Sequence, residues 1–287
     1  LEEMADMAFG SLSENEKDDF QAMLALALRG ITPEEYTQFY HIFNISGKIA
    51  EKIGADPGMD EFPFMSGGFG KKRIEIKEYE PLKDASEHTL VLRIQMKDVT
   101  KPPMWREVEV PADFDFMQLH EVIQEVVGLE NYHMWQFNAK AYDNSLQISA
   151  DMENDSPFGG GMDGMTHDAE ETYLTQFLQN KGDKLEYVYD FGDDWIFTVE
   201  VKELCDKKID HPVCRKYKSE LNALEDFGGI WSYLDARQDL DTWEKMSKKE
   251  RKKRFQERGF DSEEEYLEFL NEHRFNLDEV NAALDVY

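Results

Sequence analysis

The chain has 287 residues, of which 41% are hydrophobic and 13% aromatic, and its formal net charge at pH 7 is -29. This composition excludes a disordered chain and is typical of a globular protein of one or two domains. So acidic a surface repels phosphate groups, which disfavours nonspecific binding to nucleic acids and anionic membranes. The longest apolar run, residues 22–28, is far shorter than the roughly 20 residues that a membrane-spanning helix needs.

The two cysteines, Cys205 and Cys214, are too few for a disulfide framework, and their spacing is not that of a zinc knuckle. We therefore expect two free thiols in a reducing compartment. The first residues are acidic and show no signal peptide. Together these features favour a cytoplasmic protein.

The first part of the chain predicts a small helical module. Ser13 and Glu16 have the spacing of a capping box, and the apolar residues that follow recur with a helical period. A second helix of the same kind ends near Gly54. We expect an N-terminal helical module over residues 1–54, followed by a Pro- and Gly-rich linker over residues 55–71.

The rest of the chain, residues 72–287, predicts a sheet with a few helices. Alternating apolar and polar residues predict strands over residues 73–79, 88–96, 104–110, 134–142 and 146–148. Helical spacing predicts helices over residues 116–127, 173–178 and 275–284, with a further helix starting near Gly229. Residues 151–168 are expected to form a mobile polar loop. Because strands and helices do not alternate regularly, the expected fold class is α+β with a largely antiparallel sheet.

Residues 187–195 (YVYDFGDDW) place one glycine between acidic residues and two strand-like runs. We predict a hairpin in which Gly192 adopts a positive φ, while Asp190 and Asp193 accept backbone N–H bonds within the turn. The triplet at residues 190–192 also occurs in protein kinases, but the Gly-rich loop and the His-Arg-Asp loop of kinases are absent. The aromatic residues of the hairpin would pack one face of the sheet into the core: Tyr187, Tyr189 and Trp195.

Several unusual motifs follow one another in a characteristic order. They are residues 101–106 (KPPMWR), 110–112, 118–120, 123–124 with Gly128, His133 with Phe137 and Tyr142, 187–195, 225–229 with Tyr233, and 275–284. On these motifs, residues 74–287 resemble the plasmid pRiA4b ORF-3-like family. The resemblance implies an occurrence on plasmids and mobile elements, and it implies no established reaction. A resolvase-like activity would need a nucleophilic serine among arginines and a basic helix-turn-helix, and the sequence has neither.

A divalent-metal site is the most specific enzymatic hypothesis. Residues of ligand type near predicted loops or strand ends are His120, His133, Asp190, Asp193, Asp194, His211 and Cys214. The resemblance argues against such a site, because relatives commonly carry histidines at the positions of Trp135 and Phe197. We therefore predict no metal and no cofactor.

Glu225 and Asp226 precede Gly228 and Gly229. Like Gly192 in the hairpin, these two glycines are expected to be structural turn residues. The two acids have two interpretations. They could be a functional carboxylate pair, or they could cap the helix that starts near Gly229, since a helix dipole favours acids at its N-terminus. The second interpretation is favoured.

Residues 245–258 contain eight basic and two acidic residues and are the one candidate for a nucleic-acid contact. A helix that pairs with the acidic surface of the same protein explains them more simply. We expect no salt-sensitive binding to DNA or RNA at physiological ionic strength.

The favoured function is a noncatalytic binding module whose acidic and aromatic surface contacts a protein or a small ligand. Its candidate residues are Trp105, Arg106, His120, His133, Asp190, Asp193, Asp194, Trp195, Glu225 and Asp226. The alternative is a hydrolase or a nucleic-acid-processing enzyme in which His133, Asp190 and Asp193 bind a divalent cation. A cluster of these three side chains would support the enzyme, and dispersed side chains would support the module.

Overall fold

The computed structural model describes residues 74, 76–143, 145–150 and 165–287. The chain divides into two compact units, residues 1–71 and 72–287. The expected N-terminal helices and the linker lie outside the described residues. Within the described part, no helix is long and apolar enough to cross a membrane.

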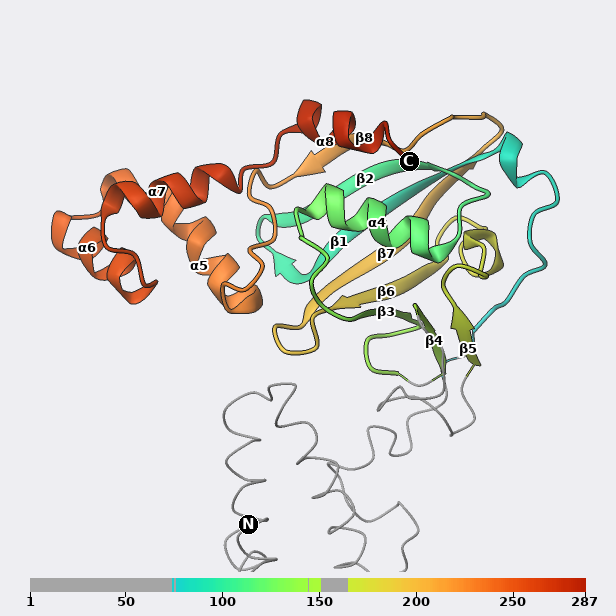
Figure 1. Ribbon diagram of the computed structural model, residues 1–287, viewed down its shortest axis with the longest axis horizontal. Coiled ribbons are helices and arrows are strands. Elements are labelled where there is room, and N and C mark those ends of the chain that lie inside the picture. The colour runs from blue at the N-terminus through green and yellow to red at the C-terminus, as the bar shows by residue number, and fades with distance from the viewer. Residues whose placement is uncertain (1–73, 75, 144, 151–164) are drawn as a thin grey trace, which may run out of the picture. The chain divides into compact units, whose positions relative to one another are not determined.

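The second unit is built on one sheet of eight strands in the order β5-β4-β3-β6-β7-β1-β2-β8 (Figure 1). Every neighbouring pair is antiparallel except β4 and β5. The strands are β1 Thr89–Thr100, β2 Pro103–Pro111, β3 Trp135–Asn138, β4 Leu146–Ser149, β5 Met165–Asp168, β6 Lys184–Tyr189, β7 Trp195–Cys205 and β8 Val213–Lys218. The predicted α+β class with a largely antiparallel sheet is therefore confirmed.

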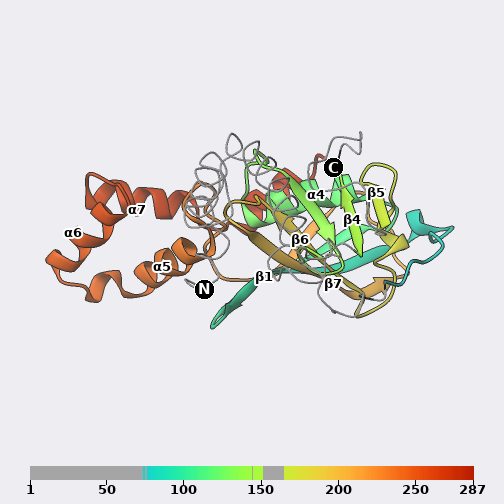
Figure 2. The same cartoon turned by 90° about the horizontal axis from the view of Figure 1, so that it is seen from below.

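Helix α4 (Phe116–Val127) lies across one face of the sheet, on the same side as α8 (Leu277–Leu284) (Figures 1 and 2). Asp115 and Gln118 cap its start reciprocally, at 2.8 and 3.0 Å. Gly128 ends it with a φ of 74°. The apolar residues that predicted this helix are all buried: Phe116, Leu119, Val122, Ile123, Val126 and Val127.

The core lies between α4 and the sheet. In β1 every second residue from Leu90 to Met96 is buried, because side chains in a strand alternate between its two faces. Tyr187, Tyr189 and Trp195 of the β6–β7 hairpin are buried on this sheet, as their spacing predicted. Each fully buried apolar side chain contributes about 1.5–3 kcal/mol, so this face supplies much of the stability.

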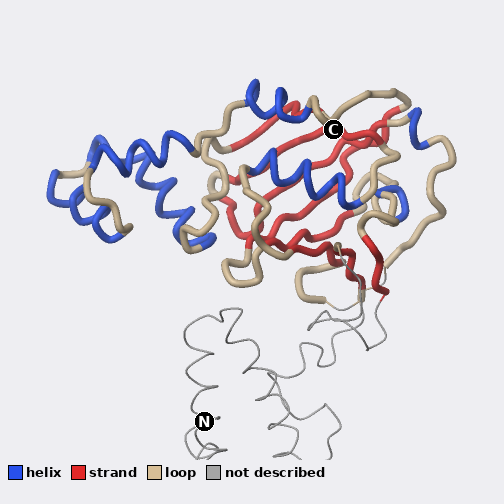
Figure 3. The backbone as a smooth tube through the Cα atoms, viewed as in Figure 1, coloured by secondary structure: helices blue, strands red, loops and turns tan. Residues whose placement is uncertain are grey.

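The remaining helices form a separate group beside the sheet (Figures 1 and 3). They are α5 Gly229–Thr242, α6 Lys248–Glu257 and α7 Glu263–Glu272. Short 3-10 helices complete the unit: η2 Ala85–Glu87, η3 Leu174–Gln176 and η4 Trp243–Lys245. The arginines of the basic segment 245–258 bind acidic residues of this group: Arg251 binds Glu263, Arg254 binds Asp239, and Arg258 binds Asp235.

Three expectations from the sequence are wrong. A strand was predicted over residues 73–79, but residues 76–79 belong to no strand, and neither does Ile74. Both edges of β1 are paired, with β2 and with β7. Residues 165–168, the described end of the predicted mobile loop, form β5, which pairs with β4. The strand predicted over residues 134–142 stops at Asn138.

Candidate metal centre

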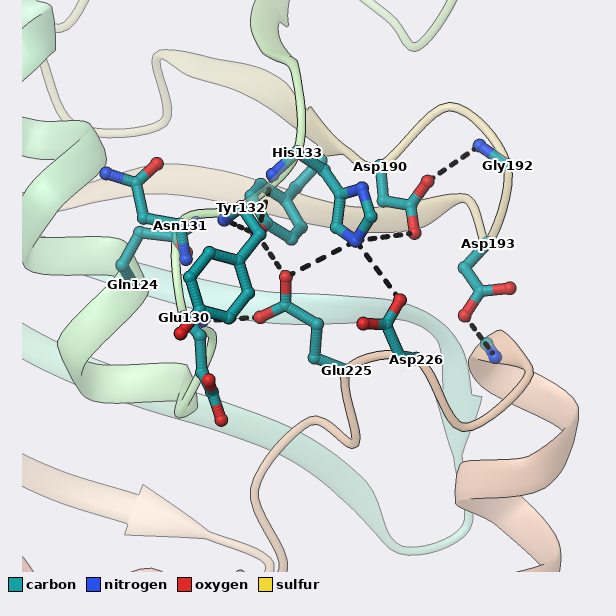
Figure 4. A network of polar contacts seen from close by, with 12 residues as sticks. Gln124, Glu130, Asn131, Tyr132, His133, Asp190, Gly192, Asp193, Glu225 and Asp226 are labelled. Carbon is teal, nitrogen blue, oxygen red and sulfur yellow. Dashed lines mark hydrogen bonds and ion pairs between the residues drawn. The ribbon is translucent and has the colours of Figure 1, made fainter. Parts of the chain in front are cut away.

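Three segments that are far apart in the sequence meet at one end of the sheet (Figure 4). They are the loop before β3, the turn between β6 and β7, and the loop before α5. Trp135 of β3 pairs with Tyr189 of β6, so the residues just outside these strands become neighbours. The backbone N–H of Asp190 donates to the carbonyl oxygen of Met134 at 3.0 Å, which fixes the loop of His133 against the turn.

One imidazole faces three carboxylates at this place (Figure 4). The Nε2 atom of His133 lies 3.2 Å from Asp226 Oδ1, 3.6 Å from Glu225 Oε1 and 3.7 Å from Asp190 Oδ2. We call these four residues the His133 cluster. Donor atoms of His133, Asp190 and Asp226 all lie within 4.8 Å of one another, a spacing that could hold a metal ion.

Burial within the His133 cluster is uneven. The side chains of Asp190 and Glu225 are 13% and 7% exposed, whereas those of His133 and Asp226 are 32% and 71% exposed. Two members are thus held by the protein, and the other two face solvent. The cluster is accessible to an ion or a ligand from one side.

Tyr189 holds the inner side of the cluster together. Its hydroxyl oxygen accepts the backbone N–H of Tyr132 at 2.8 Å and that of His133 at 3.2 Å, and its proton goes to Glu225 Oε1. The other oxygen of Glu225 accepts the backbone N–H of Glu130. Burial and the hydrogen bond to Glu225 raise the pKa of Tyr189, so the phenol stays a donor. Such bonds behind a donor atom fix its direction.

The turn between β6 and β7 differs from the predicted one. Gly192 was expected at a positive φ, but the left-handed positions are Asp190 and Asp194, with φ of 55° and 56°. Short polar side chains tolerate this region because they bond locally. Asp190 Oδ1 accepts the N–H of Gly192 at 2.9 Å, as predicted, and this leaves Oδ2 for His133.

The cap of α5 is also different from the expectation. Oδ2 of Asp193, not Glu225 or Asp226, accepts the N–H of Gly229 at 3.0 Å, so the prediction that the two acids cap this helix is wrong. Burial, with the neighbouring charge of Asp190, raises the pKa of Asp193. Gly229 has a φ of 64°, and a Cβ there would lie 2.5 Å from the carbonyl oxygen of Asp193. The turn and the helix can approach this closely only because residue 229 is glycine.

Asp226 has a φ of 55° and Gly228 a φ of 91°, so the chain reverses direction between the two acids and α5. This reversal directs Glu225 and Asp226 towards His133 instead of the helix end (Figure 4). Of their two interpretations, the functional carboxylate pair matches this geometry, and the favoured one, a helix cap, does not.

Other residues of the candidate surface lie elsewhere, and three of them are not at the surface. Arg106, His120 and Trp195 are at most 1% exposed, so their assignment to a binding surface was wrong. All three lie next to apolar core residues. The sequence pattern alone could not distinguish a buried structural residue from a member of a functional motif. Trp105 is half-buried under the guanidinium of Arg93, and Asp194 is exposed and accepts the hydroxyl of Tyr142.

The remaining residues of ligand type do not join the cluster. His211 lies 3.3 Å from Asp285, and buried Cys214 is bonded through its backbone N–H to Asn281. Both cysteines have free thiols. Sequence reasoning grouped His133 with Asp190 and Asp193; it missed Tyr189 as a support, and no short-range signal could have placed its hydroxyl under His133.

Comparisons with known proteins give one family and two similar proteins whose names state no activity. Residues 88–279 match the model of the family described as "Plasmid pRiA4b ORF-3-like protein". Uncharacterized protein y4hQ of Sinorhizobium fredii (strain NBRC 101917 / NGR234) is 27% identical over 148 residues, which cover 50% of this chain and 70% of that protein. The crystal structure of the protein of unknown function MM3350 from Methanosarcina mazei Go1 is 27% identical, with a TM-score of 0.43 over 54% of this chain and 82% of that one. All four members of the His133 cluster lie inside the residues that match the family model.

Proposed function

The chain belongs to the plasmid pRiA4b ORF-3-like family, and we propose that its domain binds a divalent cation through His133, Asp190 and Asp226. The observation that carries this proposal is the convergence of their donor atoms within 4.8 Å. Glu225 Oε1, 3.6 Å from the same imidazole nitrogen, is a fourth donor in reach. On the sequence alone no metal was expected, and this convergence is the reason to propose one.

The charge of the cluster supports a cation. Among the described residues, His133 is the one cationic partner of Asp190, Glu225 and Asp226 in an ion pair. Three carboxylates therefore share at most one positive charge. Like charges this close raise each other's energy, and a dication removes that cost while the imidazole binds it in the neutral form.

The donor set indicates the class of metal. One imidazole nitrogen with carboxylate oxygens suits borderline and hard cations such as Zn²⁺, Mn²⁺ and Fe²⁺. The second layer is already built, since Gly192 N–H bonds Asp190 Oδ1, and Tyr189 with the N–H of Glu130 bonds Glu225. Partners of this kind are found behind the ligands of metal sites, where they fix ligand direction.

We assign the bound cation a role in binding. His133 and Asp226 face solvent, so the outward coordination positions are open to an oxygen donor of a ligand. Tyr132 and Met134, on either side of His133, are 73% and 62% exposed and offer apolar contacts next to the ion. The domain would thus be a cation-dependent binding module, in keeping with the acidic and aromatic surface expected from the sequence.

Metal-assisted hydrolysis is a second candidate, supported by the three donors of His133, Asp190 and Asp226 when Glu225 stays bonded to Tyr189 and to the N–H of Glu130. Catalytic zinc sites use three protein donors and keep a position for water, whereas structural sites are closed by four. A zinc ion held by these residues would supply an activated water, because bound Zn²⁺ lowers the pKa of its water to about 7. The protein residues would then orient the ion through Asp190 and Asp226, with His133 as the third donor.

The test is a cation titration of the full chain after removal of metal with a chelator. We expect one binding event for Zn²⁺ or Mn²⁺ in calorimetry, and a loss of affinity of about tenfold or more in His133→Ala and Asp190→Asn. His211→Ala, which removes a histidine that also pairs with a carboxylate, is the matched control and should bind like the wild type.

Two outcomes would contradict the proposal: no binding by the wild type, or equal binding by all variants. The zinc-loaded protein, tested on ester, phosphodiester and peptide substrates, separates the two roles. Turnover that disappears in Asp190→Asn supports hydrolysis, and binding without turnover supports the module.

A further inference from the structure

We infer that buried His120 and Gln124 of α4 are positioning residues for the proposed cation site, because with Asn131 and Tyr187 they close a ring of hydrogen bonds under the loop that carries His133. The inference rests on the proposed function, and it adds the residues that set the affinity of that site. We call His120, Gln124, Asn131 and Tyr187 the Asn131 ring. None of the four belongs to the His133 cluster.

The direction of each bond in the ring follows from one backbone donor. The N–H of Asn131 can only donate, so Gln124 Oε1 accepts it at 2.9 Å. The amide nitrogen of Gln124 must then be the donor to the hydroxyl oxygen of Tyr187, at 2.8 Å. This step fixes the orientation of the Gln124 side chain.

The second half of the ring follows in the same way. Tyr187 uses its own proton for His120 Nδ1, at 2.7 Å, so the imidazole carries its proton on Nε2. That N–H donates to Asn131 Oδ1 at 2.9 Å, which returns the ring to the residue where it began. In this arrangement His120 is neutral, and burial, which lowers the pKa of His120 to about 4, favours that form.

The ring holds the first half of the loop, and Tyr189 holds the second half through the N–H groups of Tyr132 and His133. Asn131 has a φ of 58°, a left-handed conformation that costs free energy unless contacts hold it. Its main chain and its side chain are both held, by Gln124 and His120. The imidazole of His120 also stacks on Trp135, at 4.0 Å between ring centres, so the two ends of the loop are tied to the same side chain.

The loop passes directly from the ring to the metal ligands. Tyr132 and His133, the next two residues, donate their N–H groups to Tyr189, whose own proton goes to Glu225 (Figure 4). A change in the ring therefore moves the backbone of His133 relative to Asp190 and Asp226. The two imidazole nitrogens of His120 thus link the loop, through Asn131, to strand β6, through Tyr187.

The experiment uses the full chain and two variants that break the ring at different points. Tyr187→Phe removes the hydroxyl that links Gln124 to His120 and changes no loop residue. Asn131→Gly removes the acceptor of His120 and keeps a residue that adopts a positive φ without strain. Asn131→Asp keeps the acceptor and should restore the loop.

Two measurements are made on each variant. Residue-level amide hydrogen exchange of the metal-free protein should be about tenfold faster at Tyr132 and His133 in the two ring-breaking variants. Affinity for Co²⁺ should fall by about ten- to a hundredfold, with an altered visible spectrum of the bound ion. The matched control is Tyr266→Phe, which deletes a buried hydroxyl bonded to Asp239 at 2.8 Å and should change neither measurement.

Unchanged exchange in both ring-breaking variants would overturn the inference, as would an equal change in Tyr266→Phe. Faster exchange with an unaltered cobalt affinity and spectrum would also overturn it, because the ring would then hold the loop without affecting the site. A wild type that binds no cation contradicts the proposed function alone, and the exchange measurement still decides whether the ring positions His133.

Discussion

Arg106 and the His133 cluster lie near opposite ends of one segment, residues 218–226, and the protein treats their charges in opposite ways. The guanidinium of Arg106 is fully buried and donates to carbonyl oxygens of Val126, Lys218 and Ser219 and to the side chain of Asn222. It also stacks on Phe275, at 3.8 Å. Burial lowers its pKa from 12.5 to about 10, so it keeps its charge at neutral pH.

The His133 cluster is the reverse case. Its carboxylates outnumber their cationic partners in the described residues, and two of its members face solvent. The buried guanidinium donates to neutral carbonyl and amide oxygens, and such hydrogen bonds offset the cost of burying a charge. The carboxylates of the His133 cluster have too few positive charges around them, and a metal ion or a cationic ligand would supply the missing charge. The two sites therefore differ mainly in whether their charged groups have enough partners: Arg106 does, and the carboxylates of the His133 cluster do not.

The largest expected effect comes from removing Arg106 and its hydrogen bonds. Arg106→Met leaves several buried carbonyl oxygens without a donor, and each lost bond of this kind costs about 1–3 kcal/mol. We expect the free energy of unfolding, measured with urea, to fall by at least about 4 kcal/mol. Arg93→Met removes an arginine that pairs with Glu107 near the surface and should cost about 1 kcal/mol or less. Equal losses in the two variants would show that the carbonyl shell of Arg106 carries no special weight.

A somewhat smaller effect on stability should come from lowering the pH, which protonates His120 in the Asn131 ring. The pKa of His120 falls from 6.5 to about 4 in the folded chain, so below about pH 6.5 the unfolded chain binds a proton that the folded chain does not. The stability contributed by the neutral imidazole is present above pH 6.5 and is lost as the pH falls towards 4. The difference amounts to roughly 3 kcal/mol.

The measurement compares urea unfolding of the wild type and of His120→Gln at pH 7 and pH 4.5. Because all other titrating groups are shared, the wild type should lose more stability between the two pH values than the variant does. A loss of equal size would mean that His120 titrates in the same range in the folded and unfolded chains.

The sequence predicted the elements whose signal is local. Helix α4 spans the residues that helical spacing predicted, 116–127, and ends at Gly128, and the hairpin of residues 187–195 was evident from its glycine between acidic residues and two strand-like runs. Alternation alone misled over residues 76–79, because a strand also needs a partner strand, and these residues pair with none of the eight. Partners of that kind are set by the whole sheet and cannot be read from a short window.

The site was predicted only in part, for the same reason. His133 and Asp190 were grouped as residues of ligand type near predicted loops or strand ends, and the structure brings them together; Asp193 was assigned the wrong partner. Its carboxylate caps α5 from a turn 36 residues away in sequence, while the acids next to the helix turn towards His133. Asp226, Gly228 and Gly229 all have a positive φ at this point, and the composition gives no sign of the backbone path that they form.

The smallest expected effect is on stability, from a substitution in the His133 cluster. Without metal, Asp226→Asn should change the free energy of unfolding by no more than about 0.5 kcal/mol, because the side chain is 71% exposed and its loss relieves repulsion. With Zn²⁺ or Mn²⁺ at about a hundred times its dissociation constant, the wild type should gain about 2.7 kcal/mol, since an ion that binds only the folded chain stabilises it by mass action. The variant, titrated at the same ion concentration, should gain clearly less. Urea unfolding with and without the ion measures both quantities. A metal-free variant that is strongly destabilised would mean that the His133–Asp226 ion pair is structural in its own right, and the carboxylates would then have no deficit for a cation to fill.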